Sequence, residues 1–292
     1  LFIHLTTQDG VTPNKTSTFT YTGTGTFDGC FMDEGADSAA KLAVVYNNTA
    51  QDATWTLTGN HDIAGGYTVQ AGTLVLQGSP TPHSYYNVSD DWDYASMQGS
   101  DVTVESGAAF QLSHHALLEG NVTVENGGTF IMNQVVNADA EAISGGMRQN
   151  MAGKAITSMK GDVTLKSQYA MMTANIQSSS VTQLQGSIII TDYSNETSPK
   201  NVVSLVKEGN GILHVTGTAD LPIVQINEGG LVIGDATSRE NWYKWTIGEK
   251  GFLAAIGANP DSALNSITKD SKGVFALTAN QQTALILNDG WN

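Results

Sequence analysis

The feature that most constrains the fold is a phrase that occurs three times between Gly65 and Met132. Each copy has two short stretches of alternating apolar and polar residues around a turn of small residues, which predicts strand, turn and strand. The copies span residues 66–78, 101–112 and 121–132, and Val102 and Val122 occupy equivalent places 20 residues apart. This spacing is typical of one turn of a parallel β-helix, in which a coil buries its apolar face only against the next coil.

Looser copies of the phrase continue toward the C-terminus. Residues 224–233 align with 245–254, which equates Gly230 with Gly251, and Gly251 in turn with Gly273. A glycine suits each tight corner because a positive φ is inexpensive only for glycine. Independent hairpins in a β-sandwich are the alternative, but a sandwich favours strands at intervals of about 8–12 residues. We therefore predict an all-β solenoid, a parallel β-helix of on the order of ten coils that each add about 4.8 Å to its length.

The same pattern predicts the core and the limits of the coils. We expect residues 1–292 to form one β-helical stalk, with loop insertions at about 79–98, 137–160 and 192–202 and a short helix near 260–269. Asn259 can cap that helix, and Pro260 suits its first turn. The residues expected to face the core are Val69, Leu74, Leu76, Val102, Val104, Val122, Val124, Ile226 and Ile247.

Charge and cysteine content exclude several classes of function. The chain has 28 acidic and 13 basic residues, a net charge of −15, and its arginines are Arg148 and Arg239. Because nucleic-acid binding needs a basic surface, we expect no nucleic-acid partner. Cys30 is the single cysteine, so the fold must rest on packing and backbone hydrogen bonds. The acids between Phe27 and Ala40 match no calcium-loop spacing, and we expect neither a metal site nor a cofactor. Leu1 does not begin a signal peptide, so we expect a processed or partial chain.

The insertion from Pro80 to Tyr94 is the candidate binding site. Its two prolines do not fit a central strand, and it concentrates aromatic rings beside carboxylates, a combination that can stack on sugars and bond their hydroxyls. The alternative is that these rings fold down and cap the side of the solenoid. The candidate residues are Tyr85, Tyr86, Asp90, Asp91, Trp92, Asp93 and Tyr94.

No catalytic motif is present in the sequence, and we assign no catalytic residue. A glycine-framed serine nucleophile is missing. His114 and His115 are adjacent, so in a strand they point to opposite faces and cannot chelate one metal. Stacked coils bring distant acids together, however, so the paired carboxylates of a carbohydrate-active enzyme remain an open alternative.

Several segments resemble the passengers of immunoglobulin A protease-type serine protease autotransporters. These are Gly72–His83 with its Gly-Ser-Pro-Thr-Pro-His ending, Asp90-Asp-Trp-Asp93, Leu205–Gly217 and Ile267–Leu277, and the resemblance covers roughly residues 40–277. It implies a right-handed β-helical stalk, secreted or displayed on the bacterial cell surface as a virulence factor. It also implies an outer-membrane β-barrel in the same precursor and an N-terminal serine protease domain, whose nucleophile motif this chain lacks.

These observations together predict a non-catalytic stalk. It would display a protease or an adhesive head and itself contact a host surface glycan or matrix protein. The alternatives are a self-associating adhesin without a protease, in which two rods pair through faces rich in Asn and Thr, and a carbohydrate-active β-helix enzyme.

Overall fold

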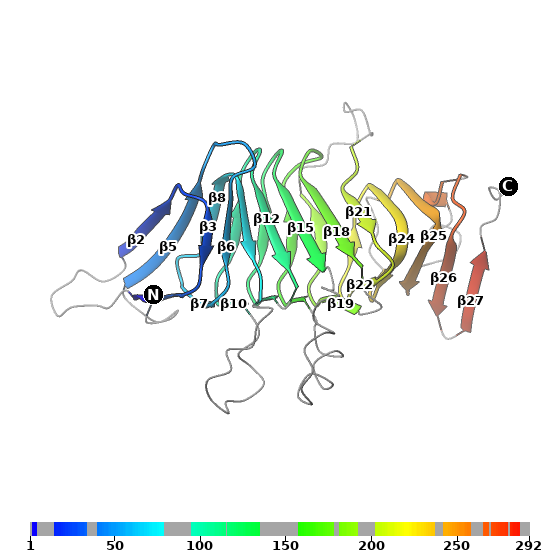
Figure 1. Cartoon of the computed structure of the whole chain (residues 1–292). Coiled ribbons are helices and arrows are strands. Elements are labelled where there is room, and N and C mark those ends of the chain that lie inside the picture. The colour runs from blue at the N-terminus through cyan, green and yellow to red at the C-terminus, as the bar shows by residue number, and fades with distance from the viewer. Residues whose placement is uncertain are drawn as a thin grey trace, which may run out of the picture.

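The computed structural model describes residues 2–4, 15–33, 40–78, 95–114, 116–134, 157–177, 181–191, 202–236, 242–257, 265–268, 270–279 and 281–286. Its strands succeed one another along a rod, from the blue strands of the N-terminal part at one end to the red strands of the C-terminal part at the other (Figure 1). The chain runs repeatedly through three parallel ladders, which we name I, II and III in the order in which each coil visits them. The predicted parallel β-helix is therefore confirmed.

Ladder I consists of short strands that each present alternate residues to the inside. Its members are β2 (Lys15–Tyr21), β5 (Ala40–Asn47), β8 (Tyr67–Ala71), β11 (Val102–Val104), β14 (Val122–Val124), β17 (Val163–Leu165), β20 (Ile188–Ile190) and β23 (Ala219–Asp220). Valine and isoleucine predominate on the inner side because β-branched side chains fit a pleated, half-buried surface.

Ladder II follows ladder I in each coil. It contains β3 (Gly25–Phe27), β6 (Thr54–Leu57), β9 (Thr73–Leu76), β12 (Ala109–Ser113), β15 (Thr129–Gln134), β18 (Met171–Ile176) and β21 (Leu205–Glu208). The first halves of β24 (Ile223–Ile233) and β25 (Lys244–Ile256) continue it.

Ladder III closes each coil and is the longest of the three. Its strands are β1 (Phe2–His4), β4 (Cys30–Met32), β7 (Asn60–Asp62), β10 (Ala95–Gln98), β13 (Ala116–Leu118), β16 (Ser158–Met159), β19 (Val181–Leu184) and β22 (Ile212–Val215), then the second halves of β24 and β25, and β26 (Val274–Ala279). These eleven parallel strands in the described residues agree with the predicted number of coils.

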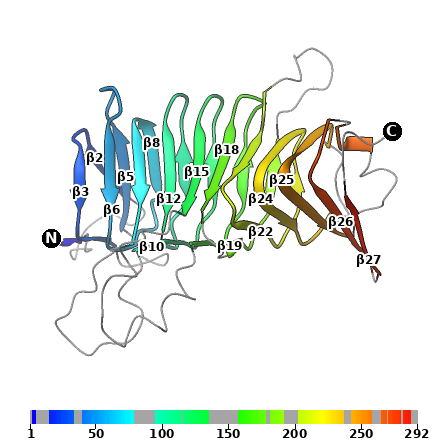
Figure 2. The same cartoon turned by 45° about the vertical axis from the view of Figure 1, so that its right-hand side comes forward.

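The register confirms the repeat on which the sequence prediction rested. Val102 pairs with Val122, and Phe110 pairs with Phe130, each 20 residues apart. Figure 2 shows β12 and β15, which carry the two phenylalanines, lying side by side along the rod. The two phenylalanine rings stack at 5.8 Å between centroids. All nine predicted core residues are at most 1% exposed.

Side-chain staples join successive coils at the corner between ladders III and I. Asp101 Oδ1 accepts a hydrogen bond from the backbone N–H of Asn121 at 2.8 Å, and Asn121 Oδ1 accepts one from Asp162 N–H at 2.9 Å. Asp162 Oδ1 accepts from Ser187 N–H at 2.7 Å, and Ser187 Oγ accepts from Thr218 N–H at 3.1 Å. In each case a side-chain oxygen of one coil accepts a backbone N–H in the turn of the next coil. That N–H lies outside the ladders and would otherwise lack a partner.

The equivalence of Gly230 with Gly251 was wrong by one residue. Ile226 pairs with Ile247, but a bulge after Ile226 shifts the register, so Gly251 pairs with Gly229. A bulge inserts one extra residue on one strand, and here it lies at the corner where β24 passes from ladder II to ladder III. Neighbouring glycines made the two alignments indistinguishable in the sequence.

Three predicted boundaries also need correction. Ala95–Gln98 and Ser158–Met159, assigned to insertions, are strands of ladder III. In the predicted helix, Asn265 and Ser266 are helical, but Ile267 already forms a parallel bridge with Trp245. The last coil differs too, because β27 (Gln281–Ile286) returns antiparallel to β26 and covers the edge of that strand.

Candidate functional site

The predicted binding loop leaves the solenoid at the corner between ladders II and III, which we call the II/III corner. Residues 79–94 connect the end of β9 to β10, and all seven candidate residues lie outside the described part of the chain. Residues 135–156 also lie outside it and connect β15 to β16, so they leave from the same corner two coils further on. Both segments therefore join a strand of ladder II to a strand of ladder III.

A lysine lies inside the solenoid further along the same corner. Lys207 is fully buried, and its Cα pairs with Ala174 on one side and Ile226 on the other, in a row whose other members are apolar. Its ammonium donates to the backbone carbonyls of Glu208 at 2.6 Å, Gly209 at 2.8 Å and Glu228 at 3.1 Å. All three ammonium donors are thereby used, as burial of a charged group requires.

Burial nevertheless makes the charged form of Lys207 less favourable. It lowers the pKa of the Lys207 ammonium to about 8, while the nearby charges of Glu208 and Glu228 oppose this shift. The ammonium therefore remains protonated at neutral pH and joins the corners of two successive coils, because Glu208 belongs to β21 and Glu228 to β24.

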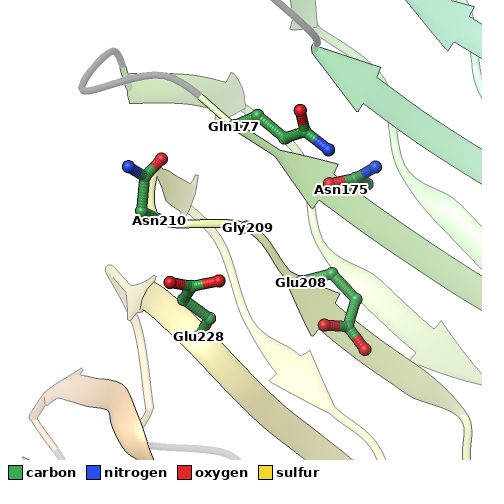
Figure 3. A pocket seen from close by; sticks show the side chains of 6 residues that line it. All are labelled: Asn175, Gln177, Glu208, Gly209, Asn210 and Glu228. Atoms are coloured by element: carbon green, nitrogen blue, oxygen red, sulfur yellow. The ribbon is translucent and has the colours of Figure 1, made fainter.

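A groove of about 520 Å³ is lined by Glu208, Gly209 and Glu228, the three residues whose carbonyls this ammonium binds. Figure 3 shows its side chains arranged around Gly209. The lining residues come from three successive coils and are Asn175, Gln177, Glu208, Gly209, Asn210 and Glu228. The lining is thus almost entirely amide and carboxylate, and its backbone carbonyls at positions 208, 209 and 228 are the ones that Lys207 binds.

Two glycines, Gly209 in the lining of the groove and Gly229 next to Glu228, let the backbones approach closely beneath it. Gly209 has a φ of +72°, and a Cβ there would lie 2.4 Å from the carbonyl oxygen of Ile176. Gly229 has a φ of +65°, and a Cβ there would lie 2.4 Å from the carbonyl oxygen of Gly209. Neither place can accept a side chain without moving the backbone, so the shape of the floor is fixed by the glycines.

The charged side chains around the groove are partly neutralised. Glu208 Oε1 accepts a hydrogen bond from the Asn227 side chain at 2.6 Å. Lys250 Nζ lies 4.0 Å from Glu228 Oε1, and both side chains are well exposed, so this ion pair adds little stability.

The histidines form no metal site within the described ranges. His61 is buried against Phe31, and its Nδ1 accepts the Phe31 N–H at 3.2 Å, which assigns the ring proton to Nε2. Burial lowers the pKa of His61 to about 4. Among the described residues, no three of His, Cys, Asp and Glu gather closely enough to hold a metal ion, and no helix is long and apolar enough to cross a bilayer.

Sequence reasoning missed both Lys207 and the groove. A signal for Lys207 existed, because Leu205 and Lys207 alternate with Val206 and so share the inner face. The groove had no comparable signal, since its residues meet only when three coils are stacked in register.

Comparison with known proteins places these features in a family context. The family model described as the PIC/HAP1/IgA0 second beta-solenoid repeat region matches residues 40–204. The chain is 23% identical over 298 residues to the immunoglobulin A1 protease autotransporter of Haemophilus influenzae, covering 88% of this chain and 18% of that protein. It is 28% identical over 103 residues to the adhesion and penetration protein autotransporter of the same species, covering 30% of this chain and 7% of that protein. The chain thus spans less than a fifth of the length of these relatives, and no solved structure matches it.

Proposed function

The chain belongs to the PIC/HAP1/IgA0 second β-solenoid repeat family and is a β-solenoid region of an autotransporter passenger, and we propose that it serves as a stalk holding a functional head away from the bacterium. The observation that carries this proposal is the succession of eleven parallel strands in the described part of ladder III. Hydrogen bonds continue from coil to coil, so the rod is stiff without disulfides. The names of the relatives support secretion or surface display.

The rest of the precursor follows from the relatives by analogy. One relative is named as an immunoglobulin A1 protease autotransporter, which supports a serine endopeptidase head elsewhere in the precursor. Another relative is named as an adhesion and penetration protein autotransporter, which supports an adhesive role. An outer-membrane β-barrel of the same precursor is the proposed partner in export.

The stalk role can be tested in the precursor displayed on bacteria. Deletion of residues 101–120 removes one coil in register, because Val102 and Val122 are ladder partners. We expect surface display and head activity to persist. Val104→Asp, which places a charge at a position that is 0% exposed, should abolish display. Loss of head activity from a deletion variant that is still displayed would contradict a spacer role.

We further propose that the segment from Pro80 to Tyr94 makes the adhesive contact with a host glycan or matrix protein. Trp92→Ala and Tyr94→Ala should reduce binding to host cells and to immobilised matrix proteins. Tyr243→Ala is the matched control, since Tyr243 is 49% exposed near the opposite end of the rod. If folded variants of Trp92 and Tyr94 bind as the parent does, the segment is a cap and not a contact.

Self-association is the second candidate, and the outer face of ladder I favours it. Thr68, Thr103, Thr123 and Thr164 are successive register partners, so their side chains form one polar row along the rod. Such a row can hydrogen-bond to the same row of a second copy. Sedimentation equilibrium should then show a dimer that Thr103→Lys and Thr123→Lys dissociate, and a monomer at all concentrations would refute this candidate.

A further inference from the structure

The groove at the II/III corner has a charge balance that restricts what it can bind. Two carboxylates, of Glu208 and Glu228, lie at its surface. Two ammonium groups offset them, that of Lys207 beneath the floor and that of Lys250 at the rim. A simple cation gains little from such a balanced site, and an anion meets carboxylates first. The groove therefore favours an uncharged ligand.

The hydrogen-bonding groups of the groove suit a ligand that both donates and accepts. The side-chain amides of Asn175, Gln177 and Asn210 have no hydrogen-bond partner within the described residues, and each offers a carbonyl acceptor and two N–H donors. The carboxylates of Glu208 and Glu228 add acceptors. Hydroxyl groups on adjacent carbons can satisfy a planar amide or carboxylate at two points, whereas an apolar ligand would leave these groups unpaired.

The floor of the groove is already in place before a ligand arrives. The positive φ of Gly209 and Gly229 and the three carbonyl bonds of Lys207 fix the backbone that carries the surrounding side chains. Little backbone ordering is then required on binding, which preserves affinity. The volume of about 520 Å³ falls in the range of small-molecule sites, roughly 300–1,000 Å³, although the lining is polar where such sites are usually apolar.

From these observations we propose that the II/III groove is a binding site for neutral glycan, with Glu228 and Asn210 on one side and Asn175 and Gln177 on the other. This inference goes beyond the stalk role and does not depend on the segment from Pro80 to Tyr94. Lys207 acts as a positioning residue, because it contacts the backbone under the groove and is itself buried.

The test is binding of the intact chain to immobilised oligosaccharides. The probes are neutral glycans, sialylated and sulfated glycans, and a lysine- and arginine-rich peptide. We expect retention on neutral glycans above all other probes. Glu228→Ala combined with Asn210→Ala should weaken it by at least about 10-fold, because loss of one hydrogen bond to a charged group already has this effect. Glu249→Ala is the matched control, because Glu249 lies at the same corner one coil further on and does not line the groove.

The double variant also offers a second measurement, which would stay unchanged if Glu228 and Asn210 only supported the fold. Removal of the Glu228 carboxylate leaves Lys250 without its partner, so the ratio of acidic to neutral glycan binding should rise. In a Trp92→Ala background the double variant should cause the same fold loss of neutral-glycan binding, because the groove does not include the segment from Pro80 to Tyr94. Four results would overturn the proposal: no preference for neutral glycans, retention unaffected by the double variant, preference for the basic peptide, or release of new reducing ends from the bound glycan.

Discussion

Acid should weaken the N-terminal coils through His61. His61 occupies an inward position of ladder III between Phe31 and Met97, and it is 1% exposed. Its Nδ1 accepts a hydrogen bond from the Phe31 N–H. Protonation of Nδ1 would therefore break this bond, because two N–H donors would face each other, and would place an uncompensated charge among aromatic rings. Burial accordingly lowers the pKa of His61 from 6.5 to about 4.

The direction of the effect follows from which state binds the proton more tightly. Between about pH 4 and 6.5 the unfolded chain is protonated at His61 while the folded chain is not, so the free energy of unfolding falls as the pH is lowered through this window. At about 1.4 kcal/mol per pH unit, the pKa difference corresponds to a loss of about 3 kcal/mol. Above pH 6.5 the contribution of His61 is constant.

The assay is urea unfolding of the parent and of His61→Gln between pH 4 and 8. The fluorescence of Trp55, whose ring lies 5.8 Å from that of Phe31, reports on these coils. Gln does not titrate, so the difference between the two unfolding free energies should shrink by about 3 kcal/mol as the pH falls from 6.5 to 4. A difference that stays constant over this range would refute the burial of a neutral imidazole.

Three further predictions concern the corners. Because the pKa of Lys207 is lowered to about 8 in the folded chain, the unfolded chain binds one proton more than the folded chain above that pH. The free energy of unfolding, measured with urea, should therefore rise toward pH 10.5 by at most about 3 kcal/mol in the parent, and should not rise in this way in Lys207→Met. Gly209→Ala should destabilise the fold by more than about 2 kcal/mol, whereas Gly107→Ala should cost only about 1 kcal/mol. Both glycines have a positive φ, but a Cβ at Gly209 would meet the backbone of Ile176, whereas one at Gly107 meets nothing within 4 Å. Equal shifts in melting temperature would contradict this. Asp162→Ala should lower the free energy of unfolding by about 1 kcal/mol, because it removes the acceptor of the Ser187 N–H. Asp162→Asn keeps an acceptor oxygen and should retain most of this stability. An Asn variant as unstable as the Ala variant would show that the hydrogen bond is unimportant.

The sequence predicted the coils best where strand, turn and strand repeat without insertions. Val102 and Val122 are in register because the first coil has the 20-residue length of the repeat. The alternation of apolar residues and the spacing of the repeat therefore predicted the same ladder partners. The bulge after Ile226 was not predictable in this way, since Gly229 and Gly230 fit either alignment. The limits of the insertions were displaced because β10 and β16 are short and carry polar residues, which weakens their alternation.

The candidate site depended on information that a linear pattern does not contain. A lysine in a strand normally marks a solvent face, yet the carbonyls of Glu208, Gly209 and Glu228 satisfy Lys207 inside the solenoid. Those carbonyls come from two coils, and their convergence is a property of the stacked corner. The aromatic segment that the sequence proposed instead, Pro80 to Tyr94, lies outside the described residues, so its role as a contact stays a prediction.

The most direct test of the stacked-coil account is a distance between two spin labels on the outer row of ladder I. With Cys30 replaced by Ser, labels at Val45 and Ile189 lie five ladder steps apart through Thr68, Thr103, Thr123 and Thr164. At about 4.8 Å per step their backbones should be about 24 Å apart, and deletion of residues 101–120 should shorten the distance by about 4.8 Å without broadening its distribution. An unchanged distance, or a broad distribution in the parent, would contradict a continuous parallel β-solenoid.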